Sequence, residues 1–130
     1  MSEVSPRPFR ILIAGSRTIN DDALLLQALD EAWRQKILLG SNIEIVAGGA
    51  LGVDSLAKKY ALARNLPYTE FKPQYLSSDD RGAPLRRNVQ MADYADVLVA
   101  IWDGKSSGTR HMIGQMEVRA KQVYIKYIHT

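Results

Sequence analysis

The stretch Val46-Ala47-Gly48-Gly49-Ala50-Leu51-Gly52-Val53-Asp54 decides the expected fold. It follows the apolar run Ile43-Glu44-Ile45-Val46 and precedes a helical pattern that begins near Ser55. A strand, a glycine-rich loop and a helix in this order present backbone N–H groups to an anion in α/β proteins. The alternative is a plain strand-to-helix turn in which the glycines only make the turn tight. The spacing Gly-Gly-x-x-Gly is not the dinucleotide fingerprint Gly-x-Gly-x-x-Gly.

The composition is that of one globular domain. The chain has 130 residues, 46% of them hydrophobic and 24% charged, and a net charge of +3. It has no cysteine and two histidines, so we predict no metal site and no cofactor. No apolar run reaches the ~20 residues of a membrane span, and residues 1–8 have no signal-peptide core. These features predict a cytoplasmic protein without a membrane partner, with a flexible lead-in at 1–8 and a domain at 9–130.

Apolar runs alternate with helical patterns on both sides of the glycine loop. Strands are expected at 9–14, 43–47, 68–71, 97–102 and 123–128. The first helix is expected to be capped by Asn20 and to continue towards Gly40, and Leu85 is expected on the inner face of the third. Right-handed crossovers then give an α/β three-layer sandwich, Rossmann-like, with a parallel five-stranded sheet. The first and fourth strands are the most apolar, which predicts the order 3-2-1-4-5 and a ligand site at the switch point between them.

Three loops converge on that end of the sheet. We predict that their backbone N–H groups and hydroxyls cradle a phosphate and that Arg17 neutralises it. Most of the cradle is expected at Gly48–Gly52 and Gly108-Thr109. The predicted ligand-binding residues of these loops are Gly15, Ser16, Arg17, Gly48, Gly49, Ala50, Gly52, Asp54, Asp103, Ser107, Gly108 and Thr109.

Several of these residues have a second interpretation. Arg17 is alternatively a solvated surface residue, and Thr109 is also suited to capping its helix. Asp54 fits three roles equally: capping its helix, orienting Arg17, or accepting a ribose hydroxyl. Trp102 is expected to pack in the core rather than to stack on a base, and His111 is expected to be structural. The sequence has no Ser-His-Asp order, no carboxylate pair at motif spacing and no Walker pattern, so we predict no catalytic residue.

The combination of these motifs resembles the SLOG superfamily, which includes DprA-type DNA-processing proteins, LOG enzymes and small stand-alone YspA-like proteins. The YspA-like proteins resemble the chain most, over nearly all of residues 9–128. The resemblance implies a Rossmann-like nucleotide-binding fold and adds Arg87 and Asn88 to the site. LOG enzymes carry a catalytic glutamate where this chain has Met112. The segments that carry the resemblance are Ile13-Ala14-Gly15-Ser16-Arg17, Gly48–Asp54, Arg87-Asn88-Val89-Gln90-Met91, Ala95-Asp96 and Ser107-Gly108-Thr109.

The leading hypothesis is therefore a protein that senses or sequesters a nucleotide or nucleotide-derived ligand. The alternatives are a LOG-like phosphoribohydrolase, with Glu117 as a candidate acid, and, third, DprA-like binding of single-stranded DNA. The small net charge disfavours a nucleic-acid partner. A homodimer or higher assembly is also expected, because several apolar and aromatic residues exceed what one core can hide. These residues are Trp33, Leu38, Leu39 and Tyr124.

Overall fold

The computed structural model describes residues 7–129, so most of the predicted lead-in lies outside the described residues. Strands and helices alternate along the described chain, as predicted. They are β1 (Phe9–Gly15), α1 (Asp22–Arg34), β2 (Ile43–Ala47), α2 (Val53–Ala63), β3 (Tyr68–Glu70), α3 (Ala83–Tyr94), β4 (Val97–Trp102), α4 (Ser107–Val118) and β5 (Gln122–Tyr127).

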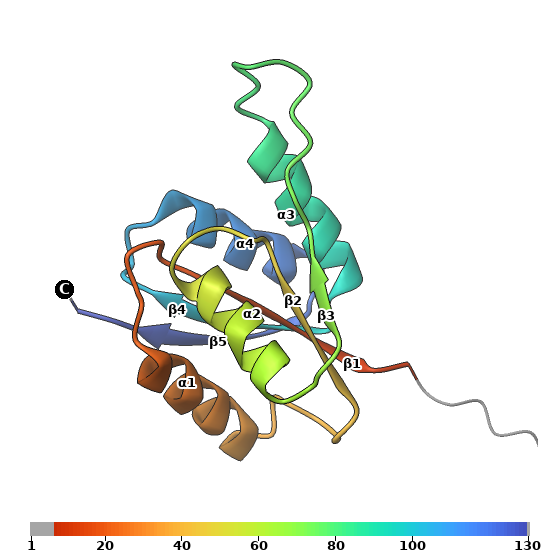
Figure 1. The fold of residues 1–130 in the computed structure, drawn as a ribbon, viewed down its shortest axis with the longest axis vertical. Coiled ribbons are helices and arrows are strands. Elements are labelled where there is room, and N and C mark those ends of the chain that lie inside the picture. The colour runs from red at the N-terminus through yellow and green to blue at the C-terminus, as the bar shows by residue number, and fades with distance from the viewer. Residues whose placement is uncertain (1–6, 130) are drawn as a thin grey trace, which may run out of the picture.

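The five-stranded sheet has the order β3-β2-β1-β4-β5, and every neighbouring pair is parallel. The prediction of fold class and strand order is confirmed. Ile11 of β1 is paired with Ile45 of β2 and with Val97 of β4, so these apolar strands form the centre. Helices α1 and α2 cover one face and α3 and α4 the other (Figure 1).

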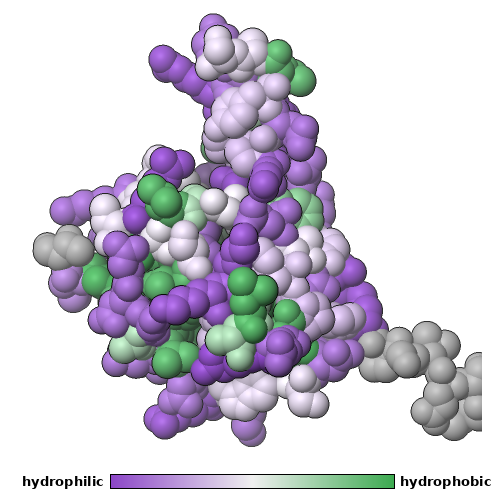
Figure 2. Space-filling view, in the orientation of Figure 1, coloured by the Kyte–Doolittle hydropathy of each residue, from purple (hydrophilic) through white to green (hydrophobic). Residues whose placement is uncertain are grey.

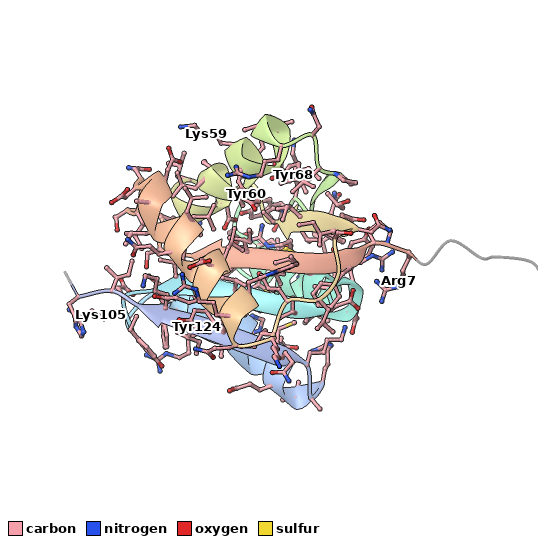
Figure 3. All side chains as sticks on the ribbon, turned by 90° about the horizontal axis from the view of Figure 1, so that it is seen from below. Arg7, Lys59, Tyr60, Tyr68, Lys105 and Tyr124 are labelled. Atoms are coloured by element: carbon pink, nitrogen blue, oxygen red, sulfur yellow. The ribbon has the colours of Figure 1, made fainter. Side chains whose placement is uncertain are left out.

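Alternation along the strands divides the core into two halves. Ile11 and Ile13 pack under α1 and α2, whereas Leu12 and Ala14 pack under α3 and α4. Every residue of β4 is buried, as a central strand covered on both faces requires. Figure 3 shows Arg7 at the amino end of this sheet and Lys105 at the opposite, carboxyl end. The carboxyl end is where the three predicted loops leave the sheet.

Helix α1 differs from the prediction at both ends. Its cap is Asp21, whose Oδ1 accepts from the Ala23 amide at 2.9 Å, and not Asn20. It ends at Arg34 rather than continuing towards Gly40, because Lys36 adopts φ 60° and turns the chain. The amide of Ile37 then bonds the Ala32 carbonyl at 3.0 Å, the long-range bond of a Schellman ending.

The loop between β3 and α3, together with the first turn of α3, projects from the domain (Figure 1). We call residues 72–85 the arm. Asp80 organises it by accepting from the amides of Leu76 and Gly82, at 3.0 and 3.1 Å, and by pairing with Arg86. The Arg86 guanidinium, helped by the Leu76 amide, lowers the pKa of Asp80 to about 2.

The arm also explains why Leu85 does not lie on the inner face of α3, where it was expected. Leu85 is 46% exposed because this turn extends past the sheet. Figure 2 also shows a small apolar patch near the tip of the arm, beyond this turn. The buried residues of α3 are instead Ala83, Asn88, Met91 and Ala92.

Of the four apolar and aromatic residues that were expected to exceed the core, two are exposed. Leu38 is buried, and Tyr124, which lies beside α1 in Figure 3, donates to Glu31 Oε1 at 2.6 Å. Trp33 and Leu39 are 47% and 58% exposed. Among residues 7–129, no helix has the length and apolar character needed to cross a membrane.

Candidate functional site

A cavity of about 580 Å³ opens at the carboxyl ends of the central strands. All of the predicted ligand-binding residues line it except Gly49 and Gly52. The switch point between β1 and β4 is therefore hollow, as the topology predicts for a ligand site. Eight lining residues were not among the predicted site residues: Ala14, Thr18, Arg81, Pro84, Leu85, Met91, Ser106 and Met112.

Glycines hold the loops in contact with each other. Gly52 has φ 75°, and a Cβ added to it would lie 2.4 Å from the Ser16 carbonyl oxygen. A Cβ on Gly48 would lie 2.5 Å from Arg87 Nη1. The glycine at position 52 therefore permits close contact between two loops, and the one at 48 makes room for an arginine.

Asp54 is a buried carboxylate within the glycine loop. Its Oδ2 accepts from the Ala50 amide at 3.1 Å, and α2 has no side-chain cap. Burial raises the pKa of Asp54, while the amides of Ala50 and Gly48 and the cations Arg87 and Arg17 oppose that shift. The Ala50 amide, a predicted phosphate donor, is thus already used by the chain's own carboxylate.

Arg87 joins three elements beneath the cavity. Its Nη1 donates to the carbonyls of Gly48 at 2.7 Å and Phe71 at 3.2 Å, and its Nε donates to Asn88 Oδ1 at 3.1 Å. Burial lowers the pKa of Arg87, and the Coulombic attraction of Asp54 opposes that change. A guanidinium keeps its charge at neutral pH under such conditions, so Arg87 places a fixed cation at the site.

Asn88 connects Arg87 to α4. Its side chain is 6% exposed, and its Nδ2 lies 3.4 Å from the Gly108 carbonyl and 3.0 Å from His111 Nδ1. Both ends of this amide are therefore occupied by protein groups. His111, expected to be structural, does not line the cavity but contacts a residue that does.

The loop after β4 is built around Asp103. Its Oδ1 accepts from the amides of Lys105 and Ser106, both at 2.8 Å, and the Ser106 amide contributes most to lowering the pKa of Asp103. Ser106 Oγ lies 3.1 Å from Ser16 Oγ, which joins this loop to the loop after β1. Trp102 packs in the core and donates from Nε1 to the Ser106 carbonyl at 3.1 Å, in agreement with its predicted core role.

The N-terminus of α4 faces the cavity. Ser107, Gly108 and Thr109 line it, and the N-cap residue Ser106 makes no side-chain cap to this helix. The first N–H groups of a helix have no partner within the helix, and they carry partial positive charge. Thr109 is buried, whereas Ser107 and Gly108 are exposed. This turn therefore offers donors that no side chain of the cap satisfies.

Four of the eight lining residues that were not predicted are apolar side chains of the two helices that also carry polar groups of the site. Pro84, Leu85 and Met91 come from α3 and Met112 from α4. A usable signal was present, because positions 84, 87, 88 and 91 share one face at the i, i+3, i+4, i+7 spacing of a helix. Because Arg87 and Asn88 were expected at the site, the same spacing also places Pro84 and Met91 there.

Metal-binding side chains do not cluster in the described part of the chain. Across residues 7–129, no group of three or more His, Asp, Glu or Cys side chains is placed to hold a metal ion.

The fold and the cavity define a Rossmann-like α/β domain with a polar site at its switch point. The profile of the YspA, cpYpsA-related SLOG family matches residues 9–76, just over half of the chain, and the chain belongs to this family. No curated protein matches the chain at a significant level.

Two solved structures of DNA processing protein A share the fold. The protein from Helicobacter pylori, described for its single-stranded DNA binding mode, is 19% identical with a TM-score of 0.66 over 92% of this chain and 65% of that one. The protein from Streptococcus pneumoniae is 14% identical, with a TM-score of 0.66 over 92% of this chain and 50% of its own. The chain thus spans about half to two thirds of these proteins.

Proposed function

We propose that this protein binds a nucleotide or nucleotide-derived ligand in the switch-point cavity, and that it senses or sequesters this ligand. The observation that carries the proposal is the composition of one cavity. Arg17, Arg81 and Arg87 line it together with the uncapped start of α4, and apolar side chains of α3 and α4 line it beside them. A ligand that combines an anionic group with a flat apolar group matches this mixed lining. We assign the binding domain to residues 9–130.

The anionic end belongs at α4 in this proposal. Ser107, Gly108 and Thr109 supply helix N-terminal donors, and Arg17 is an exposed cation at the same rim. The glycine loop is less suited to a phosphate, since Asp54 already accepts from Ala50 and would repel a second anion. Of the two loops expected to share the phosphate, the contacts favour the loop that begins α4.

The sugar of the ligand is assigned to Asp54. This carboxylate lines the cavity between the glycine loop and Arg87, and it accepts hydrogen bonds. A ribose hydroxyl is a neutral donor, so it can contact Asp54 without the repulsion that a phosphate meets. The base then faces Pro84, Leu85, Met91 and Met112.

Single-stranded nucleic acid is the second candidate, because the arm carries both an exposed Tyr75, 59% accessible, and Arg81, which lines the cavity. Aromatic side chains beside cations bind unpaired bases, and the Helicobacter protein of the same fold has a single-stranded DNA binding mode. Two other arginines are engaged within the protein. Arg86 is paired with Asp80, and Arg110 donates to the Gly104 carbonyl at 3.0 Å.

Phosphoribohydrolase chemistry has less support. Met112 stands where the LOG glutamate is expected, is 1% exposed and lines the cavity. Glu117 is exposed and is not a lining residue of the cavity as described. The two carboxylates that do line it, Asp54 and Asp103, both accept hydrogen bonds from amides of their own loops.

Mass spectrometry of the small molecules released from purified, denatured protein tests the proposal. We expect a phosphorylated compound that carries a base, and its loss from an Arg17→Ala variant purified in parallel. Retention of nucleic-acid fragments instead, with binding that weakens steeply as salt rises, would favour the second candidate. Absence of any phosphorylated compound, together with no change on Arg17→Ala, would contradict both.

A further inference from the structure

A row of side chains runs from α4 to the cavity through the interface between α3 and α4. His111 contacts Asn88, Asn88 contacts Arg87, and Arg87 contacts the glycine loop at Gly48. We propose that His111 is a positioning residue for Arg87 and that it acts through the side-chain amide of Asn88. The proposal rests on the function proposed above only in that Arg87 is taken to meet the ligand.

The contacts determine which way the Asn88 amide points. Its Oδ1 lies 3.1 Å from Arg87 Nε, which can only donate. Its Nδ2 lies 3.4 Å from the Gly108 carbonyl, which can only accept. A flipped amide would set donor against donor at Arg87 and acceptor against acceptor at Gly108, so the observed orientation is the satisfied one.

This orientation dictates the role of His111. Asn88 Nδ2 lies 3.0 Å from His111 Nδ1 and donates, whereas Gln115 Nε2, whose amide oxygen accepts from Arg119, lies 3.4 Å from His111 Nε2. A neutral imidazole has one accepting nitrogen, and the shorter contact assigns it to Nδ1. The Gly108 contact is longer, so the imidazole is the closer of the two acceptors that hold the amide. Removing it leaves Nδ2 held only by the longer contact to the Gly108 carbonyl, so the amide of Asn88 holds Arg87 Nε less firmly.

This arrangement holds the guanidinium of Arg87 in place. Its Nε and both hydrogens of Nη1 are used by Asn88, Phe71 and Gly48. Within residues 7–129, no protein group bonds Nη2, so its two N–H groups remain for a ligand at the lining of the cavity. A guanidinium fixed at three positions loses little conformational freedom when it binds, so a fixed Nε contributes to affinity.

The first test is spectroscopic and uses the protein without ligand. The long-range proton–nitrogen spectrum of the wild-type protein at neutral pH should show His111 Nδ1 as the unprotonated nitrogen. The Arg87 Nε–H signal, assigned by its loss in Arg87→Lys, should be protected from solvent exchange. A proton on Nδ1 of the neutral ring would overturn the proposal without recourse to any further variant.

The second test compares three variants. His111→Phe keeps a flat ring without an acceptor, His111→Gln restores a carbonyl acceptor, and Gln115→Ala removes the side chain 3.4 Å from the other imidazole nitrogen. We expect faster exchange of the Arg87 Nε–H in His111→Phe, and near wild-type exchange in the other two. With AMP as the probe, we expect an affinity loss of about tenfold in His111→Phe and rescue in His111→Gln.

The two readouts separate this proposal from the function on which it rests. Equal Nε–H protection in folded His111→Phe and wild-type protein would refute the positioning role, whatever AMP does. The expected exchange pattern with no AMP binding by the wild type would keep the positioning role and count against the proposed ligand class.

Discussion

Arg87 Nη1 lies 2.7 Å from the carbonyl oxygen of Gly48, which joins α3 to the glycine loop after β2. A glycine at position 48 leaves room for this contact, because a Cβ there would lie 2.5 Å from the same nitrogen and the arginine would have to shift. The glycine loop is thus shaped to admit an arginine from a helix on the opposite side of the site. This is a different role from an open cradle for phosphate.

The first prediction concerns Arg87→Lys. Lysine keeps the charge but cannot reproduce three bonds from Nε and Nη1 to Asn88, Gly48 and Phe71. We expect the unfolding free energy to fall by about 1–2 kcal/mol and AMP affinity by about tenfold or more. Urea unfolding and calorimetry measure the two effects. Arg86→Lys is the control, since this neighbour pairs with Asp80, and unchanged AMP affinity is expected there.

The second prediction concerns Asp54→Asn. Burial raises the pKa of Asp54 above its ordinary value of 3.8, so the charged form is less favourable in the folded than in the unfolded protein. The wild type therefore loses stability as pH rises through the folded pKa. Asparagine carries no charge and can still accept from Ala50, so we expect a higher Tm at pH 7 and no advantage below pH 3.8.

The binding of anions extends that prediction. Removing the charge of Asp54 also removes repulsion from the cavity, so inorganic phosphate should bind more tightly to Asp54→Asn. A lower Tm at every pH, with weaker phosphate binding, would mean that attraction to Arg87 and Arg17 outweighs the burial of the carboxylate.

The third prediction concerns the arm and Asp80. The pKa of Asp80 is lowered from 3.8 to about 2, first by the Arg86 guanidinium. The stabilisation it gives is complete above pH 3.8 and is lost as pH falls towards 2. In Asp80→Asn we expect faster hydrogen exchange at the amides of Leu76 and Gly82 already at neutral pH. Asp79→Asn is the matched control, because Asp79 holds the side chain of Ser77. Equal exchange in both variants would disprove a special role for Asp80.

The fourth prediction compares two glycines. Gly52→Ala places a Cβ 2.4 Å from the Ser16 carbonyl at φ 75°, and we expect a loss of about 1–3 kcal/mol in unfolding free energy. Gly114 lies inside α4 with no atom within 4 Å of an added Cβ. Gly114→Ala should therefore be neutral or stabilise by about 0.5–1 kcal/mol. Thermal unfolding measures the change in stability of both variants. Equal changes in Gly52→Ala and Gly114→Ala would contradict the loop contact at Gly52.

The fifth prediction concerns metal. The proposed anion contacts come from Arg17, Arg87 and the N-terminus of α4, which together supply positive charge without an ion. We expect a chelator to leave AMP affinity within about twofold, an energy change below about 0.4 kcal/mol. A larger loss in the presence of chelator would show that a metal bridges ligand and protein.

The fold was largely predictable because its signals are local. The uniformly apolar runs of β1 and β4 indicated two central strands, and glycine loops at strand ends placed the site at their carboxyl edge. The end of α1 was not predictable in the same way. Ile37 continues the helical spacing of apolar residues, but Lys36 takes a left-handed conformation that few non-glycine residues adopt.

The site was predictable in its position and less so in its contacts. Sequence spacing placed Asp54 and Ala50 close together, but it did not predict that the Asp54 carboxylate accepts a hydrogen bond from the Ala50 amide. The contact between Asn88 and His111 joins α3 to α4, so it depends on how the two helices pack and not on local sequence propensity. The arm depends in the same way on the pairing of Asp80 with Arg86, so its length alone did not indicate an ordered structure.

Calorimetric titration of the wild-type protein with nucleoside mono- and diphosphates at fixed salt tests the central claim most directly. We expect saturable one-site binding of at least one of them, and an affinity that drops in Arg87→Lys but not in Arg86→Lys. The account would be contradicted if no nucleotide gave saturable binding, or if Arg87→Lys bound the same nucleotide as tightly as the wild type.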